Sequence, residues 1–186
     1  MSLKVEPTEI PDVRLVVPSR WADDRGFFSE TYNADQFKKV RLSMEFVQDN
    51  HSLSLKIGTI RGLHFQSPPF EQDKLVRVVR GRILDVAVDL RHSSSTYGQH
   101  VRAELSAENW HQLFIPIGFA HGFCTLEPNT EVIYKVSARY SPEHDRGIIW
   151  NDPQLGIEWP VTQNSVSLSD KDRKLPKFSK SGAYFE

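Results

Sequence analysis

The sequence predicts a mainly β protein, an antiparallel sandwich or barrel with only a few short helices. Apolar and polar residues alternate with a period of two in several short segments, which is the pattern of half-buried strands. Turn signals built on glycine and proline recur between these segments, and helix signals are few. Many short strands separated by frequent turns are typical of β-sandwiches and β-barrels.

The alternation is clearest in residues 83–90, where every even-numbered position is apolar and the odd-numbered positions include Asp85 and Asp89. A run rich in β-branched residues, 75–79, comes just before this segment. The turn between the two runs contains Gly81, which can adopt positive φ, so we expect a β-hairpin here. Further strands are predicted at residues 101–106, 113–115 and 132–136.

Two short helices are predicted from their capping residues. Asn33 precedes residues 34–40 and can cap a short helix there. Ser169 can cap another turn of helix through residues 170–174.

A chain of 186 residues suits one domain with a sizeable core, or one domain with peripheral arms. The last stretch is polar and interrupted by proline, so we expect it to pack on the barrel as an arm. The predicted organisation is a single domain over residues 1–186, with an N-terminal arm at about 1–45 and a C-terminal arm at about 164–186.

Composition narrows the class of protein. The net charge of −1 favours neither nucleic acid nor an anionic membrane as the main partner. A local basic pocket can still hold a phosphate, and Arg25 and Arg61 are candidates for holding a diphosphate through paired N–H donors. Cys124 is the only cysteine, which rules out an intrachain disulfide and a four-thiolate metal site. The start of the chain lacks the apolar stretch of a secretory signal, and no apolar run approaches the ~20 residues of a spanning helix. We therefore expect a soluble cytoplasmic protein.

One histidine and one lysine flank a short proline-containing loop. His64 precedes the loop, residues 67–70, and Lys74 follows it. A second histidine, His121, lies in a glycine-punctuated segment that reads as a turn. An isolated histidine usually has its hydrogen bonds satisfied inside a core, and a lysine at the end of a strand is usually exposed to solvent. A base, a fixed cation and a second imidazole on one β-scaffold instead suggest proton transfer beside an oxygen that gains negative charge.

The two histidines also raise the question of a metal site. The position two residues after His64 is occupied by Gln66, and the next acid, Glu71, lies beyond two prolines. His64 and His121 alone make a poor first shell for a metal ion. We therefore predict no metal requirement.

Several motifs together resemble one family, the dTDP-4-dehydrorhamnose 3,5-epimerases, over about residues 10–176. The motifs are RGLHFQ at 61–66, QDKLVR at 72–77, PIGFAHGF at 116–123, EVIYK at 131–135, YSPE at 140–143, WNDP at 150–153 and LSDKD at 168–172. The resemblance implies a cupin-like β jelly roll, a homodimer and no cofactor. Together with the general tendency of open jelly-roll edges to pair, it predicts that an edge strand pairs across the interface. Two arrangements stay open for Arg25 and Glu30: they serve the site of their own subunit, or they complete the neighbour's.

The resemblance further implies a role for each matching residue. The family's catalytic base matches His64, and the carboxylate that pairs with this base matches Asp172. The family's proton donor matches Tyr134, and its lysine beside the sugar keto group matches Lys74. The residue that stacks on thymine matches Tyr140. Substrate contacts match Arg25, Glu30, Gln48, Asn50, Arg61, His121 and Lys171, together with Asp145 at a position where some relatives carry Glu. Tyr134 shares a face with Val132 and Val136, so we expect His64, Lys74 and Tyr134 to line the interior of one barrel.

The implied reaction is epimerisation of dTDP-4-keto-6-deoxyglucose at C3 and C5 to dTDP-4-keto-rhamnose, in dTDP-rhamnose biosynthesis. One alternative is a relative that inverts only C3 or only C5 in another dTDP-deoxysugar pathway. Another is a non-catalytic protein that binds nucleotide sugars on the same scaffold. Such a protein would be expected to lose the base or the acid, whereas His64 and Tyr134 are both present.

Overall fold

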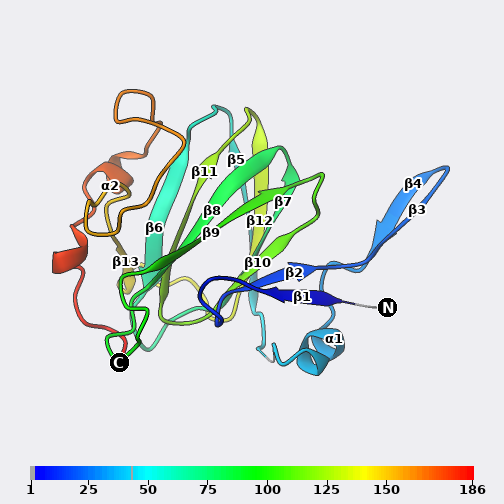
Figure 1. Cartoon of the computed structure of the whole chain (residues 1–186), viewed down its shortest axis with the longest axis horizontal. Helices are drawn as coiled ribbons and strands as arrows, with labels where there is room; N and C mark the ends of the chain where they lie inside the picture. Colours follow the sequence, from blue (N-terminus) through cyan, green and yellow to red (C-terminus); the bar gives the residue numbers. More distant parts are fainter. Residues whose placement is uncertain (1–2, 43) are drawn as a thin grey trace.

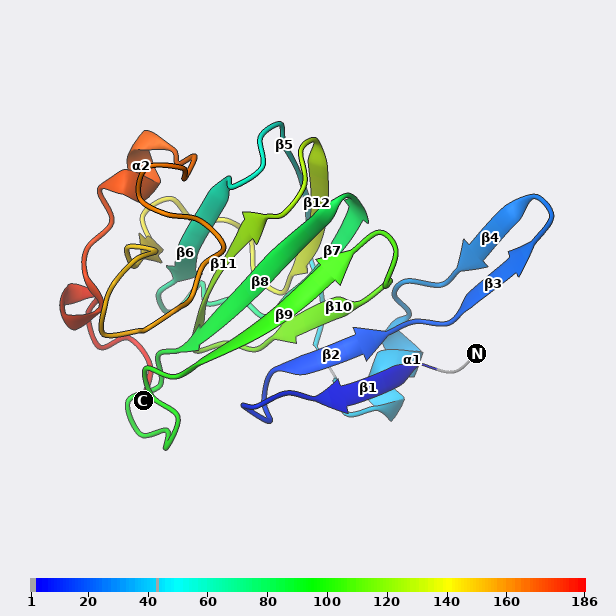
Figure 2. The ribbon, with the colours of Figure 1, turned by 45° about the horizontal axis from the view of Figure 1, so that its top comes forward.

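Two antiparallel sheets face each other and form the body of the protein (Figures 1 and 2). The computed structural model describes residues 3–42 and 44–186. Its strands are β1 (Lys4–Pro7), β2 (Arg14–Val17), β3 (Arg20–Asp23), β4 (Gly26–Ser29), β5 (Gln48–Ser54), β6 (Ile60–Gln66), β7 (Lys74–Arg80), β8 (Arg82–Asp89), β9 (His100–Ser106), β10 (Gln112–Ile115), β11 (Phe119–Thr125), β12 (Thr130–Val136) and β13 (Asp145–Gly147). One sheet has the order β1-β2-β10-β7-β12-β5 and the other β13-β6-β11-β8-β9, while β3 and β4 form a separate hairpin.

The predicted mainly β fold is confirmed, and so are both short helices. Helix α1 (Ala34–Lys39) begins after Asn33, whose side chain accepts hydrogen bonds from the backbone N–H groups of Asp35 and Gln36. Helix α2 (Asp170–Arg173) begins after Ser169, whose side chain accepts from the N–H of Asp172. A single 3-10 turn, η1 (Phe178–Lys180), follows. Within the described residues, no helix has the length and apolar character needed to cross a membrane.

The central core lies between the two sheets and draws on both. Its members are Val76, Val78, Leu113, Ile115 and Val132 from the six-stranded sheet, and Ile83, Ala87, Val101, Leu105, Phe119 and Phe123 from the five-stranded sheet. These residues are at most a few per cent exposed. The period-2 alternation therefore arises because every other side chain of these strands points between the sheets.

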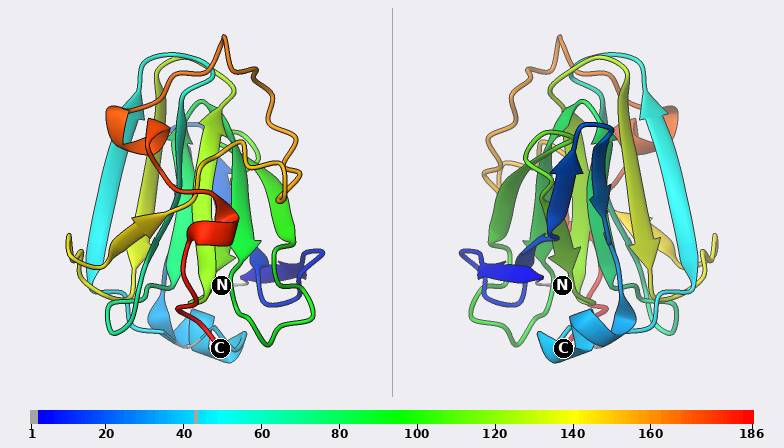
Figure 3. Two further views of the ribbon diagram at one scale, coloured as in Figure 1. Left: turned by 90° about the vertical axis from the view of Figure 1, so that its left-hand side faces the viewer. Right: turned by 90° about the vertical axis from the view of Figure 1, so that its right-hand side faces the viewer.

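Strand β8 is buried on both faces. Its inward residues Ile83 and Ala87 belong to the central core. Its outward residues Val86 and Val88 belong to a second cluster, which the C-terminal part of the chain covers. That cover comes from Leu155, Ile157, Trp159, Phe178, Tyr184 and Phe185. The face of β8 that carries Leu84, Val86 and Val88 thus points away from the sandwich centre, under the C-terminal segment that runs along one side of the body (Figure 3).

The hairpin predicted at Gly81 is wrong. Strand β7 pairs with β10 and β12, whereas β8 pairs with β11 and β9, so the turn carries the chain from one sheet to the other. Gly81 does adopt the positive φ expected of it, 76°. Adjacency in the sequence predicts that two neighbouring strands pair, but β7 and β8 each pair with strands farther along the chain.

The N-terminal region is only partly separate from the body. Strands β1 and β2 extend the six-stranded sheet, and β2 pairs with β10. The β3–β4 hairpin, by contrast, projects away from the sandwich (Figures 1 and 2). The predicted N-terminal arm includes residues 1, 2 and 43, which lie outside the described residues. We propose that the chain is one domain, because the N-terminal strands and the C-terminal segment each share an apolar cluster with the sandwich.

Replacing Gly81 with alanine should destabilise the fold more than replacing Gly156. Both glycines have positive φ, 76° and 58°, which costs an L-residue about 1–2 kcal/mol. A Cβ at Gly81 would also collide with the buried Thr130, whereas nothing lies within 4 Å of a Cβ at Gly156. Urea denaturation of both variants measures the two losses in unfolding free energy. Equal losses would contradict the tight packing inferred at the crossing between the sheets.

Candidate active site

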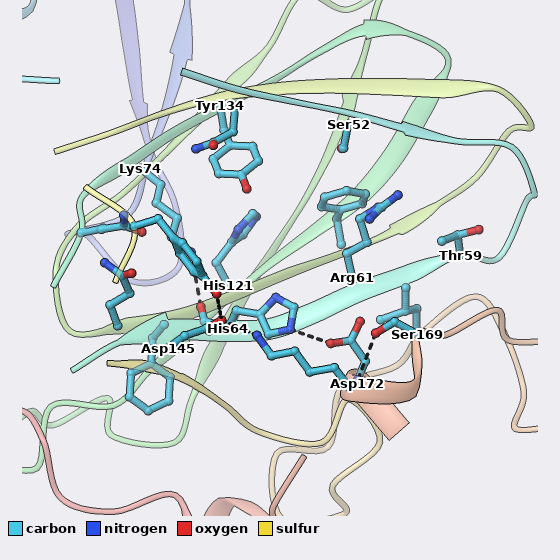
Figure 4. Close-up of a pocket in the computed structure, with 18 of the residues that line it drawn as sticks. Ser52, Thr59, Arg61, His64, Lys74, His121, Tyr134, Asp145, Ser169 and Asp172 are labelled. Atoms are coloured by element: carbon cyan, nitrogen blue, oxygen red, sulfur yellow. Dashed lines mark hydrogen bonds and ion pairs between the residues drawn. The ribbon is translucent and has the colours of Figure 1, made fainter. Parts of the chain in front are cut away.

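A cavity of about 600 Å³ opens between the two sheets and is closed on one side by α2 (Figure 4). Every site residue proposed from the sequence lines it except Arg25 and Glu30. Strand β5 contributes Gln48 and Asn50, β6 contributes Arg61 and His64, β7 contributes Lys74, β11 contributes His121, β12 contributes Tyr134, β13 contributes Asp145 and α2 contributes Lys171 and Asp172, while Tyr140 lies in the loop after β12. The structure thus brings His64, Lys74 and Tyr134 to one interior, as expected from the sequence.

His64 is paired with a carboxylate from the C-terminal segment. Its Nε2 lies 2.6 Å from Oδ1 of Asp172, which the cap of α2 fixes through the hydroxyl of Ser169. Burial raises the pKa of Asp172, but its interactions with His64, together with smaller ones with Ser169 and Lys171, outweigh burial and lower this pKa overall. With Asp172 ionised, Nε2–H of His64 donates to it. Nδ1 then keeps its lone pair and has no hydrogen-bond partner among residues 3–42 and 44–186.

Lys74 is buried beside this histidine. Its side chain is almost fully enclosed, and Nζ donates to the backbone oxygen of His64 at 3.4 Å. Burial lowers the pKa of Lys74 to about 8, against the opposing charges of Asp145 and Asp85. The ammonium therefore persists at neutral pH in a buried position, where its charge acts strongly on a nearby oxygen.

Tyr134 is a half-buried phenol on the sheet that faces His64 and that also carries Lys74. It packs against the central core with Val132, which confirms that it points inward, and it faces Asn50 across the β12–β5 ladder. Burial raises the pKa of Tyr134, with Arg61 opposing the rise and Asp145 adding to it. The hydroxyl is therefore protonated at neutral pH and can donate a proton or a hydrogen bond.

The mouth of the cavity carries a flat aromatic ring held by its neighbours. Tyr140 is 56% exposed, its hydroxyl donates to Oδ2 of Asp145 at 2.8 Å, and its backbone N–H donates to Oε1 of Gln48 at 3.1 Å. Lys171 forms an ion pair with the same carboxylate oxygen of Asp145. An exposed ring fixed at both ends is suited to stacking on a planar base.

Arg25 and Glu30 lie away from the cavity. Arg25 is at the tip of the β3–β4 hairpin, where its guanidinium pairs with Asp23 at 2.6 Å. Glu30 follows β4 and accepts a hydrogen bond from the side chain of Asn33. Neither residue reaches the cavity formed by its own chain.

The glycine-rich segment around His121 is a strand and not the predicted turn. His121 lies in the middle of β11 and pairs with His64 across the β11–β6 ladder. Gly122 packs against the backbone of Arg61 and Gly62, so glycine serves here for close approach between strands and not for a turn.

A fully buried carboxylate, Asp85, belongs to this site and was not proposed from the sequence. Its Oδ1 lies 2.6 Å from Nε2 of His121. One feature of the sequence points to a role for Asp85: it is an acid at an inward position of β8, between the core residues Ile83 and Ala87. Among the described residues, no three His, Cys, Asp or Glu side chains gather as a metal-binding cluster, and metal independence stays a prediction.

Comparisons with known proteins agree on one family. The family model described as dTDP-4-dehydrorhamnose 3,5-epimerase matches residues 7–180. A relative of that name from Sinorhizobium fredii is 54% identical, over 90% of this chain and 85% of the relative. A solved structure of a dTDP-4-dehydrorhamnose 3,5-epimerase from Bacillus anthracis, with TDP and PPi bound, is 52% identical with a TM-score of 0.92, covering 95% of this chain and 99% of that chain.

A second solved structure comes from Legionella pneumophila. It is a dTDP-6-deoxy-D-glucose-3,5-epimerase in complex with dTDP-4-keto-L-rhamnose, 40% identical with a TM-score of 0.93, covering 98% of this chain and 96% of that chain. These matches span nearly the whole chain in both sequence and structure, and the cupin-like fold expected from the resemblance agrees with them. The chain belongs to the dTDP-4-dehydrorhamnose 3,5-epimerase family.

Proposed function

We propose that the chain epimerises dTDP-4-keto-6-deoxyglucose at C3 and C5 and so forms dTDP-4-keto-rhamnose for dTDP-rhamnose biosynthesis. The observation that carries the proposal is the convergence of His64, Lys74 and Tyr134 on one cavity. Relatives of 52–54% identity that bear the name 3,5-epimerase support it, as does the Legionella complex.

The chemistry follows from the keto group. The C–H bonds at C3 and C5 are acidic because both carbons are alpha to the C4 carbonyl. Nδ1 of His64 removes the proton, and Asp172 stabilises the imidazolium through Nε2. The C–H electron pair forms a double bond to C4, the π electrons of the carbonyl move onto O4, and the buried ammonium of Lys74 stabilises the resulting O4 oxyanion. Tyr134 then delivers a proton from the other side of the ring. Each step uses only side chains of the protein, and we propose that neither metal nor cofactor takes part.

We propose that the nucleotide lies at the mouth of the cavity. Tyr140 would stack on thymine, while Arg61 and Lys171 would meet the diphosphate with their positive charges. Gln48 and Asn50, which hydrogen-bond to each other at 2.8 Å, would add polar contacts from β5. His121 and Asp145 would contact the substrate deeper in the cavity.

We also propose a homodimer in which each β3–β4 hairpin reaches the partner's cavity. The hairpin projects from the body and exposes Trp21, Phe27 and Phe28, an apolar surface suited to protein contact. Arg25 and Glu30 would then serve the neighbouring site, which explains why they lie far from their own. The open edges at β5 and β9 are further surfaces for pairing between subunits. A cytoplasmic location is part of the proposal and is compatible with a single, buried thiol.

In D₂O, the protein should convert the 4-keto sugar nucleotide with deuterium entering at both C3 and C5. His64→Ala should lower exchange at both carbons by at least about 10²-fold, because no enolate forms without the base. Tyr134→Phe should lose inversion more than exchange, because deprotonation survives and protons return to the original face. Asp172→Asn should be intermediate, since the base remains but its orientation and tautomer are disturbed.

Proton NMR of the products measures labelling and configuration together. Labelling at one carbon would replace the 3,5-epimerase with a mono-epimerase, and no turnover at all would favour a binding protein. If His64→Ala exchanged the C3 and C5 protons with solvent at a near wild-type rate, the assignment of His64 as the base would be refuted. The family likeness would then support the fold alone.

Tyr140→Ala should raise KM more than it lowers kcat. Stacking on an aromatic ring contributes ~1–3 kcal/mol per base, so KM should rise about 10-fold or more. Tyr140→Phe is the matched control, because it keeps the ring and removes only the hydroxyl that binds Asp145. Steady-state kinetics of both variants measure KM and kcat. An unchanged KM in Tyr140→Ala would mean that thymine does not stack on Tyr140.

Mixed dimers test whether Arg25 acts across the interface. Arg25→Ala and His64→Ala should each be impaired alone, and co-refolding them in equal amounts should restore activity to about a quarter of the sites. The restored sites combine an intact cavity with the partner's intact hairpin. Mixing without any gain, or a monomer by sedimentation at micromolar concentration, would argue that Arg25 does not serve a neighbouring site.

A further inference from the structure

The reaction proposed above leaves one fully buried acid without a role. Asp85 is 0% exposed, and its Oδ1 contacts Nε2 of His121 at 2.6 Å. Its other oxygen, Oδ2, is buried and has no hydrogen-bond partner among the described residues. The negative charge of Asp85 raises the pKa of Lys74, which lies on the facing sheet.

The fold alone gives no reason for a carboxylate at this position. The inward neighbours of Asp85 on β8 are Ile83 and Ala87, both in the central core. Burying a charge costs several kcal/mol, and replacing a buried ion pair with apolar side chains of similar volume is often neutral or stabilising. A charged group with one unsatisfied oxygen at such a position suggests a part in the chemistry of the cavity.

Asp85 determines which nitrogen of His121 is available to a ligand. An ionised Asp85 accepts the proton-bearing Nε2–H, so Nδ1 is left as the nitrogen free for the cavity that His121 lines (Figure 4). Burial lowers the pKa of His121. Asp85 opposes this effect, and the charges of Lys74 and His64 add to it. The ring is therefore neutral at neutral pH, and Nδ1 is an acceptor for a sugar hydroxyl.

We propose that Asp85 is a positioning residue for the epimerisation, which orients His121 through Nε2 and supplies a negative charge that acts on Lys74. This inference rests on the proposed function for its kinetic consequences, but the Asp85–His121 contact can be tested without turnover.

The charges around Lys74 determine the direction of the expected pH effect. Asp145 on β13 and Asp85 on β8 both favour its ammonium. The other titratable side chains that line the cavity are Arg61, His64, His121, Tyr134, Tyr140, Lys171 and Asp172. Without Asp85, only Asp145 opposes burial, so the pKa of Lys74 falls below its value of about 8. As the pH is raised, Lys74 of the variant loses its proton, and with it the stabilisation of the enolate, at a lower pH than in the wild type.

Asp85→Asn should lower kcat by roughly 10- to 100-fold, the range found when the partner of a functional histidine is removed in metal sites. The alkaline limb of its kcat–pH profile should also move to lower pH. Asp89→Asn is the matched control, because Asp89 is an equally buried acid on the same strand and face but binds Arg91, Ser94 and Thr96 outside the cavity. It should lower stability and leave the alkaline limb in place.

Nitrogen-15 NMR of histidine-labelled protein provides the readout that does not need activity. Wild-type His121 should carry its proton on Nε2, and Asp85→Asn should weaken or reverse that preference. An Nδ1–H tautomer in the wild type would overturn the proposal even if Asp85→Asn failed to fold. Wild-type kcat and an unmoved limb in Asp85→Asn, or an equal shift in Asp89→Asn, would also overturn it. Failure of the proposed function would look different, since the wild type itself would show no turnover.

Discussion

The hydrogen bond between His64 and Asp172 joins parts of the chain that are 108 residues apart and links the sandwich to the C-terminal segment at the site. His64 belongs to a strand of the sandwich, whereas Asp172 belongs to a four-residue helix in the C-terminal segment. A helix this short has little stability of its own. Its position is maintained by the Ser169 cap and by the apolar cluster of Trp150, Leu168 and their neighbours beneath it. Packing of the arm therefore orients the base.

The same sandwich accommodates a dry core and a charged cavity because its strands alternate. Inward positions of β8 supply Ile83 and Ala87 to the core, and Asp85 to the side chain of His121, which lines the cavity. Burial depresses the pKa of Lys74, and the acids around it counteract that effect. An all-apolar interior would be easier to stabilise, but it would have no base, no cation and no proton donor. The polar interior at this end is thus a local departure from the rules of core packing, of the kind expected at functional sites.

The sequence predicted the elements better than their partners. Period-2 patterns located β7, β8, β9, β10 and β12, and the caps Asn33 and Ser169 located both helices, because these signals are local. The pattern around Gly81 predicts a hairpin because pairing between distant strands leaves no local signal. The segment of β11 reads as a turn, whereas its one glycine, Gly122, serves close packing between strands. His64 and Lys74 were found from residue type and spacing. The roles of Asp172 and Tyr140 came from family resemblance, and Asp85 emerged only when burial was visible.

The central claim is geometric: a base and an acid lie on opposite faces of one sugar ring, with a cation at its O4 oxygen. A crystal structure of the protein with a bound dTDP-6-deoxyhexose tests it most directly. The account predicts the ring inside the sandwich, with Nδ1 of His64 facing one side, the hydroxyl of Tyr134 facing the other, and Nζ of Lys74 within hydrogen-bonding distance of O4. A sugar bound outside the cavity, or His64 and Tyr134 on the same face of the ring, would contradict it.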